Sequence, residues 1–132
     1  MRVVDASAVV AALVDSAADG RWAETEIARG ELAGPELVLA EAGNILRRLE
    51  LAGDLSRLEA GSAHRELLRL DIDLYPFAPF AERVWALRSN LTCYDAWYVA
   101  LAEMLACPLV TLDERLSRAP GPRCLFATPP RA

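Results

Sequence analysis

The strongest constraint on the fold is the alternation of short apolar runs with longer segments of helical character. Runs typical of strands occupy residues 2–4, 71–77, 108–113 and 123–127, and those at 2–4 and 108–113 are typical of buried strands. Helical segments occupy residues 6–14, 22–29, 57–70, 79–89, 94–106 and 114–117, and another begins after a Gly34-Pro35 turn and stops near Gly53. This alternation predicts an α/β fold, a three-layer α/β/α sandwich with a central, mostly parallel sheet. The 132 residues fit a single domain.

Local signals refine this prediction. Ser56 and Glu59 have the spacing of a capping box and open the helical segment that follows. Residues 94–106 are almost all apolar or small, which predicts a helix buried on most sides with Glu103 at its exposed edge. Two prolines after Phe126 predict a frayed C-terminal tail.

Composition excludes several classes of function. No apolar run reaches the roughly 18 residues of a membrane span, and the N-terminal segment lacks the charge pattern of a signal peptide, so we expect a cytoplasmic protein with no membrane partner. Three cysteines without CxxC spacing and one histidine favour free thiols and argue against a zinc site. The net charge of −5 argues against a nonspecific nucleic-acid coat. All 14 basic residues are arginines, which excludes mechanisms that need lysine.

Four acidic residues stand in settings unlike those of the other acids. Asp5 and Asp113 follow predicted strands, and sites in parallel sheets form beyond the carboxyl ends of the strands. Glu41 lies beside the apolar face of its helical segment, and Asp95 lies at the start of a buried one. Each also has a purely structural explanation, because the aspartates suit helix starts and the glutamate suits a boundary between apolar and polar faces. These explanations stay open for each residue alone.

Taken together, the four positions indicate a metal site. Carboxylates that converge at one edge of a sheet repel each other, and burial adds a desolvation cost. Divalent cations remove this repulsion, and Mg²⁺ or Mn²⁺ prefer all-oxygen sites that leave room for substrate phosphate. Such ions activate water for attack on a phosphodiester and stabilise the leaving oxygen. Ser7, Asn44 and Thr111 lie near the acids in sequence and offer supporting polar groups.

Basic and aromatic residues near the acids are candidate RNA contacts. Arg47, Arg48 and Arg115 are placed to contact phosphate. Tyr94 and Trp97 flank Asp95 and offer rings on which a base could stack, although core packing is the expected role of Trp97.

Four stretches, VVDASA, LAEAGNILRR, YDAWYVALAE and VTLDERL, resemble in order and spacing the PIN-domain ribonucleases, and most closely the VapC toxins of bacterial type II toxin–antitoxin systems. The resemblance covers roughly residues 1–126 and implies a single PIN domain over residues 1–132. The family's catalytic and metal-binding acids fall on Asp5, Glu41, Asp95 and Asp113, and its polar helpers fall on Ser7, Asn44 and Thr111.

The resemblance also implies an activity and partners. Such proteins use Mg²⁺ or Mn²⁺ to cleave RNA, often a tRNA or a ribosomal RNA loop, and so inhibit translation. A cognate VapB-like antitoxin blocks the acidic site, the complex binds promoter DNA through the antitoxin, and homodimers are usual. Residues 6–14 and 36–52 offer more apolar area than one small sheet can cover, which predicts an exposed groove suited to an antitoxin helix.

Other interpretations fit the residues less well. Some phosphoryl-transfer enzymes also begin with a strand that ends in aspartate, but they typically use a lysine, which this chain lacks. The phosphatases among them also need a second acid two positions later, where this chain has Ser7. There is no GxGxxG or GK[ST] loop. A nucleophilic pair of Cys93 and His64 is disfavoured, because His64 lies among polar neighbours. A catalytically inactive PIN-like module that binds protein or RNA is the main alternative, but it would have no need of four mutually repelling acids.

Overall fold

The computed structural model describes residues 1–131, and its centre is a parallel sheet with the strand order β3-β2-β1-β4-β5. The strands are β1 (Arg2–Val4), β2 (Leu32–Pro35), β3 (Ile72–Tyr75), β4 (Leu109–Val110) and β5 (Phe126–Ala127). The chain builds outward from β1 to β3 and then returns to the other side of β1 for β4 and β5. The strand order therefore reverses between β1 and β4, and a crevice forms at such a reversal, beyond the carboxyl ends of the strands.

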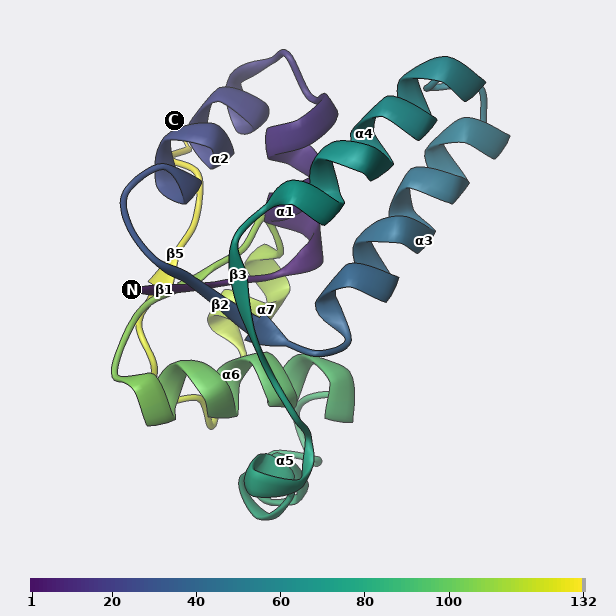
Figure 1. The fold of residues 1–132 in the computed structure, drawn as a ribbon. Coiled ribbons are helices and arrows are strands. Elements are labelled where there is room, and N and C mark those ends of the chain that lie inside the picture. Colours follow the sequence, from purple (N-terminus) through teal and green to yellow (C-terminus); the bar gives the residue numbers. More distant parts are fainter. Residues whose placement is uncertain (132) are drawn as a thin grey trace.

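Helices cover both faces of this sheet. In Figure 1, α1 to α4 lie on one side of the strands, and α5 and α6 lie on the other. The helices are α1 (Ala6–Val14), α2 (Ala18–Ile27), α3 (Val38–Leu51), α4 (Arg57–Arg69), α5 (Ala81–Ala86), α6 (Cys93–Leu105) and α7 (Glu114–Arg118), with a 3-10 turn, η1 (Ala78–Phe80), before α5. This arrangement confirms the predicted α/β/α sandwich. Among residues 1–131, no helix has both the length and the apolar character needed to cross a membrane.

The central strands and α6 supply much of the core. Both valines of β1 and both residues of β4 are fully buried. Every residue of α6 from 96 to 102 is buried, as its composition predicts. At the start of α4, the predicted capping box forms in both directions between Ser56 and Glu59. Burial of this apolar surface is the main stabilising contribution to such a fold.

The structure corrects the predicted turn at Gly34 and Pro35, because both residues belong to β2. Glycine and proline favour turns, which explains why the sequence pattern predicts one. Pro35 stands at the end of the strand opposite Tyr75, and the next N–H, that of Glu36, donates to the Tyr75 carbonyl at 2.9 Å. Gly34 packs under α3, where a Cβ would come within 3.1 Å of Val38 Cγ1. A small residue is therefore useful here inside a strand.

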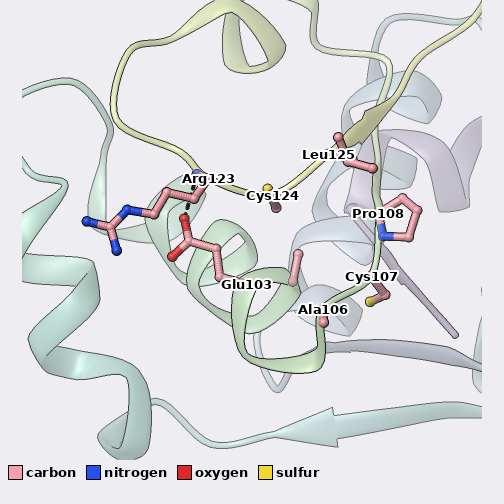
Figure 2. Close-up of a pocket in the computed structure, with 8 residues that line it drawn as sticks. Glu103, Ala106, Cys107, Pro108, Arg123, Cys124 and Leu125 are labelled. Carbon is pink, nitrogen blue, oxygen red and sulfur yellow. Dashed lines mark hydrogen bonds between the residues drawn. The ribbon is translucent and has the colours of Figure 1, made fainter.

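Glu103 is not at an exposed edge but is half-buried in an ion pair, which corrects a second expectation. Its carboxylate accepts from Arg83 Nε at 2.7 Å, from Arg83 Nη2 at 3.0 Å and from the Arg123 N–H at 2.7 Å. Figure 2 shows Glu103 beside Arg123. Both line a cavity of about 480 Å³, together with Cys107 and Cys124. Burial acts to raise the pKa of Glu103, but the hydrogen bonds from Arg83 and Arg123 outweigh it and lower that pKa.

The C-terminal tail is docked rather than frayed, which corrects a third expectation. Pro129 is buried. Arg131 donates to Asp19 of α2 and to Glu114 of α7, each at 3.0 Å. The two ion pairs hold the tail against both helices, and they support α7, which has only 5 residues of its own.

Replacing Glu103 with glutamine should lower the free energy of unfolding at neutral pH by about 1–2 kcal/mol, because Arg83 loses a charged partner in a partly exposed and therefore screened pair. The lowered pKa of Glu103 means that its contribution is present above the pKa of the unfolded carboxyl and is lost as pH falls through the folded pKa. The difference between wild type and Glu103→Gln should therefore shrink at acid pH.

Urea unfolding at neutral pH and at roughly pH 3 measures this difference. Glu66→Gln, on an exposed position of α4, serves as the control and should leave stability nearly unchanged at both pH values. A Glu103→Gln effect of the same size at both pH values would contradict the prediction.

Candidate active site

A pocket of about 250 Å³ opens beyond the carboxyl ends of β1 and β4, where the strand order reverses. The pocket brings together all four acids singled out from the sequence, and two of the three supporting residues lie with them. It is lined by Asp5, Ala6, Ser7, Glu41, Asn44, Ile45, Arg48, Asp95, Tyr98 and Asp113. The third supporting residue, Thr111, is fully buried and donates a hydrogen bond to Asp5. We call this hollow the acidic pocket.

Asp5 is buried and is held by three donors. Its Oδ1 accepts from the Ser7 hydroxyl at 2.6 Å and from the Ala8 N–H at 3.0 Å, and the second of these bonds caps α1. Its Oδ2 accepts from the Thr111 hydroxyl. Burial raises the pKa of Asp5 and the charge of Asp95 adds to this, whereas the three hydrogen bonds lower it. Helix capping and placement in the pocket therefore coexist in one residue.

Thr111 links Asp5 to Asp113. Its hydroxyl, just beyond β4, donates to Asp5 and accepts from the Asp113 N–H at 2.9 Å. Asp113 in turn caps α7, since its Oδ1 accepts from the N–H groups of Arg115 at 3.0 Å and Leu116 at 3.2 Å. One buried hydroxyl thus fixes the two aspartates that follow neighbouring strands.

Tyr98 is a pocket residue that the sequence analysis did not single out. Its hydroxyl donates to Glu41 Oε1 at 2.5 Å and so joins α6 to α3. Burial raises the pKa of the Tyr98 phenol, and the hydrogen bond and negative charge of Glu41 and the charge of Asp5 raise it further. The hydroxyl therefore stays protonated and acts as a donor. Tyr98 follows Asp95 by three positions, which puts both on one side of α6, and this spacing is the signal that could have found it.

Asp95 lies half-buried in the first turn of α6. Thr92 is the N-cap, and its hydroxyl accepts from the Asp95 N–H at 3.1 Å. Within residues 1–131 this cap is one-sided, because the reciprocal bond seen at the start of α4 is not formed here. Burial raises the pKa of Asp95 and the charge of Asp113 raises it further, whereas Thr92 and Arg115 lower it. The backbone of Asp95 serves the helix, and its carboxylate lines the pocket.

The donor set suits Mg²⁺ or Mn²⁺, although its oxygens do not form a finished coordination shell. The four acids supply the hard oxygen ligands that these ions prefer. Burial and mutual repulsion raise the pKa of Asp5 and of Asp95, and a cation would relieve that repulsion. Within the described chain, no three Asp, Glu, His or Cys side chains are positioned to hold one ion as they stand. Binding would therefore require the carboxylates to move toward one another.

Comparison with known proteins assigns the chain to a family. The PIN domain family matches residues 2–122. Ribonuclease VapC9 of Mycobacterium tuberculosis is 44% identical over 131 residues, which is 99% of this chain and 100% of VapC9. The chain belongs to the VapC ribonucleases of the PIN-domain family. This membership confirms the family predicted from the four sequence stretches.

Solved structures of similar fold agree with this assignment. A protein from Pyrobaculum aerophilum matches with a TM-score of 0.71 and 28% identity, over 95% of this chain and 81% of its own. VapC20 of M. tuberculosis, described as a toxin that cleaves the sarcin-ricin loop, matches with a TM-score of 0.67 and 18% identity, over 89% and 93%. VapBC2 from Rickettsia felis, bound to a promoter DNA fragment, matches with a TM-score of 0.66 and 15% identity, over 96% and 97%. The last two are related to this VapC chain in fold alone.

Replacing Thr111 with valine keeps the volume of the side chain and removes its hydroxyl. We expect a loss of roughly 1–3 kcal/mol in the free energy of unfolding, because Asp5 and the Asp113 N–H each lose a buried partner. The matched control is Thr25→Val, since the Thr25 hydroxyl donates to the Arg21 carbonyl on an exposed helix face. That control should change stability by less than about 0.5 kcal/mol. Urea unfolding measures both, and equal effects would show that the Thr111 hydroxyl is no structural link.

Proposed function

We propose that this VapC chain, folded as one PIN domain over residues 1–132, cleaves RNA phosphodiester bonds with Mg²⁺ or Mn²⁺ held by Asp5, Glu41, Asp95 and Asp113. The observation that carries the proposal is the convergence of these carboxylates, from four separate elements, in one pocket. Helix capping or a polar boundary explains each acid alone but does not explain why the four meet. Such a cluster is unfavourable without a cation.

The chain's own residues hold and orient this site. Ser7 and Thr111 fix the carboxylate of Asp5 through hydrogen bonds. Tyr98 fixes one oxygen of Glu41 and leaves the other for a ligand. Asn44 lines the acidic pocket from α3, as Glu41 does, and offers an amide to water or substrate. A bound divalent ion lowers the pKa of water and neutralises phosphate charge, which is the chemistry that phosphodiester hydrolysis needs.

The proposed substrate is an RNA of translation, a tRNA or a ribosomal RNA. VapC9, which is 44% identical, is named a ribonuclease. VapC20 is described as cleaving the sarcin-ricin loop, which supports a structured loop as the class of target. Cleavage of such an RNA would inhibit translation.

The variant Asp95→Asn separates helix capping from catalysis. Because the cap uses the backbone N–H of Asp95, and because asparagine also suits helix starts, we expect the free energy of unfolding to stay within about 1 kcal/mol of wild type. Cleavage of cellular RNA with Mn²⁺ should fall at least about a hundredfold, as it should for Asp5→Asn. Sequencing of RNA ends after brief induction measures it, with Glu24→Gln on an exposed position of α2 as the active control.

A wild-type protein that is purified free of any partner, and that neither binds Mn²⁺ nor cleaves cellular RNA, would refute the proposal. That outcome would favour the inactive binding module instead. Loss of activity together with loss of folding in Asp95→Asn would assign the residue to the helix and not to the chemistry.

A second hollow, of about 450 Å³, lies beside the acidic pocket between α1 and α3, and we call it the α1–α3 groove. Much of its lining is apolar: Val10, Ala11, Val14, Ile45, Leu49, Leu55 and Leu112. We propose that a helix of a cognate VapB-like antitoxin lies in this groove with its apolar face inward. Ser7, Ile45 and Arg48 line both hollows, so an occupant of the groove would reach the rim of the acidic pocket.

The wider assembly is part of the same proposal. VapBC2 of R. felis is described as bound to a fragment of its promoter, which supports promoter binding through the antitoxin in a complex of this kind. The VapC resemblance further supports a homodimer and a cytoplasmic location for this chain.

Placing a charge in the groove should weaken the antitoxin complex. In Val14→Asp an unpaired carboxylate meets an apolar helix face, and we expect at least about a tenfold loss of affinity for the co-expressed antitoxin. The matched control is Leu68→Asp, which changes a leucine that is 60% exposed on α4 and lies outside the groove. Titration of purified toxin with antitoxin measures the affinities, and circular dichroism checks folding. Equal affinities for the two variants would remove the groove as the binding surface.

A further inference from the structure

Arg48 is the one basic residue among those that line the acidic pocket. It lies on α3, one turn after Asn44 and two turns after Glu41, so the three side chains follow one face of the helix. At a rise of 1.5 Å per residue, Arg48 stands about 10 Å along the helix from Glu41. Arg48 therefore borders the pocket at a point along α3 that is away from Glu41.

Arg48 also differs from the arginines that stabilise the fold. Arg2 pairs with Glu26, and Arg83 pairs with Glu103. Arg131 pairs with both Asp19 and Glu114. The side chain of Arg48 is exposed and forms no hydrogen bond or ion pair with any of residues 1–131. All of its donors are thus available to a ligand, and a planar guanidinium matches the oxygens of a phosphate in a bidentate manner.

An RNA strand brings a row of phosphates to a chain whose net charge is −5. A cation held by the four carboxylates would offset the charge of the phosphate being cleaved and would leave its neighbours without a partner. Contacts to the neighbouring phosphates position a strand and supply most of its nonspecific affinity. A free guanidinium at the rim of the pocket meets this need.

We propose that Arg48 binds the RNA phosphate next to the one that is cleaved and thereby sets the position of the strand in the acidic pocket. The assignment rests on the ribonuclease function proposed above and adds a substrate-binding residue to it. Arg48 acts through its charge and its forked donors, and it takes no proton and holds no metal.

The structure provides a matched control in the preceding residue. Arg47 is also exposed on α3, but it lines a different hollow, between α3 and α4, together with Arg57 and His64. Arg47→Gln and Arg48→Gln remove the same charge from adjacent positions of one helix. Any difference between the two variants therefore reports the place of the charge and not the change in net charge.

The test measures binding of an uncut RNA. Variants are made in an Asp95→Asn background, and a fluorescein-labelled single-stranded RNA of mixed sequence is titrated by fluorescence anisotropy at several salt concentrations. Arg48→Gln should weaken binding about tenfold and should reduce the slope of log Kd against log salt by about 0.7, the value for one phosphate of a single strand. Arg47→Gln should change Kd by about twofold or less, and Arg48→Lys should restore the slope while regaining part of the affinity.

Three results would overturn the proposal: equal effects of Arg47→Gln and Arg48→Gln, an unchanged salt slope in Arg48→Gln, or no measurable RNA binding in the Asp95→Asn background. Thermal unfolding followed by circular dichroism confirms that the exposed substitutions leave the fold intact. Cleavage by otherwise wild-type protein with Mn²⁺ separates the two proposals. Cleavage without an Arg48 effect on binding refutes only the role of Arg48, whereas an Arg48 effect without cleavage refutes only the nuclease.

Discussion

The buried carboxylate of Asp5 is the constraint on which the rest of the site depends. Burying a charged group is costly unless donors surround it, and here two segments supply three donors. Ser7 and the Ala8 N–H come from α1, and the Thr111 hydroxyl comes from the end of β4. These bonds fix how α1 leaves β1 and how far β4 advances beside it. The same hydroxyl of Thr111 accepts from the Asp113 N–H, so one buried group links the two aspartates where the strand order reverses.

A hydrogen bond also couples the two helical layers of the sandwich. Glu41 on α3 and Tyr98 on α6 belong to helices on opposite faces of the sheet, and a single hydrogen bond joins them at its carboxyl edge. Residues 96–102 of α6 are buried, so packing sets the position of this part of the helix, and Tyr98 transmits that position to the carboxylate of Glu41 on α3. The acids of this VapC chain are thus presented by elements whose places are determined by the core.

The sequence predicted the layers and the meeting of the acids, because hydrophobic periodicity and strand-end positions are local signals. It missed β2, since Gly34 and Pro35 carry turn propensity that pairing with β3 overrides. It misjudged Glu103, because the partner, Arg83, lies 20 positions away and only the fold brings the two together. Tyr98 escaped notice for the same reason: an apolar helix context hides a hydroxyl whose acceptor is 57 positions away. Local sequence patterns determine where helices and strands form, whereas these contacts depend on the tertiary structure.

The common wall of the acidic pocket and the α1–α3 groove has an evolutionary consequence. Ser7, Ile45 and Arg48 face both hollows, so a substitution there that suits a new partner also alters the surroundings of the carboxylates. Val10 and Val14 line the groove without lining the acidic pocket. Divergence among paralogues that keep their chemistry while exchanging partners is therefore expected to concentrate at these α1 positions, and the shared wall is expected to change slowly.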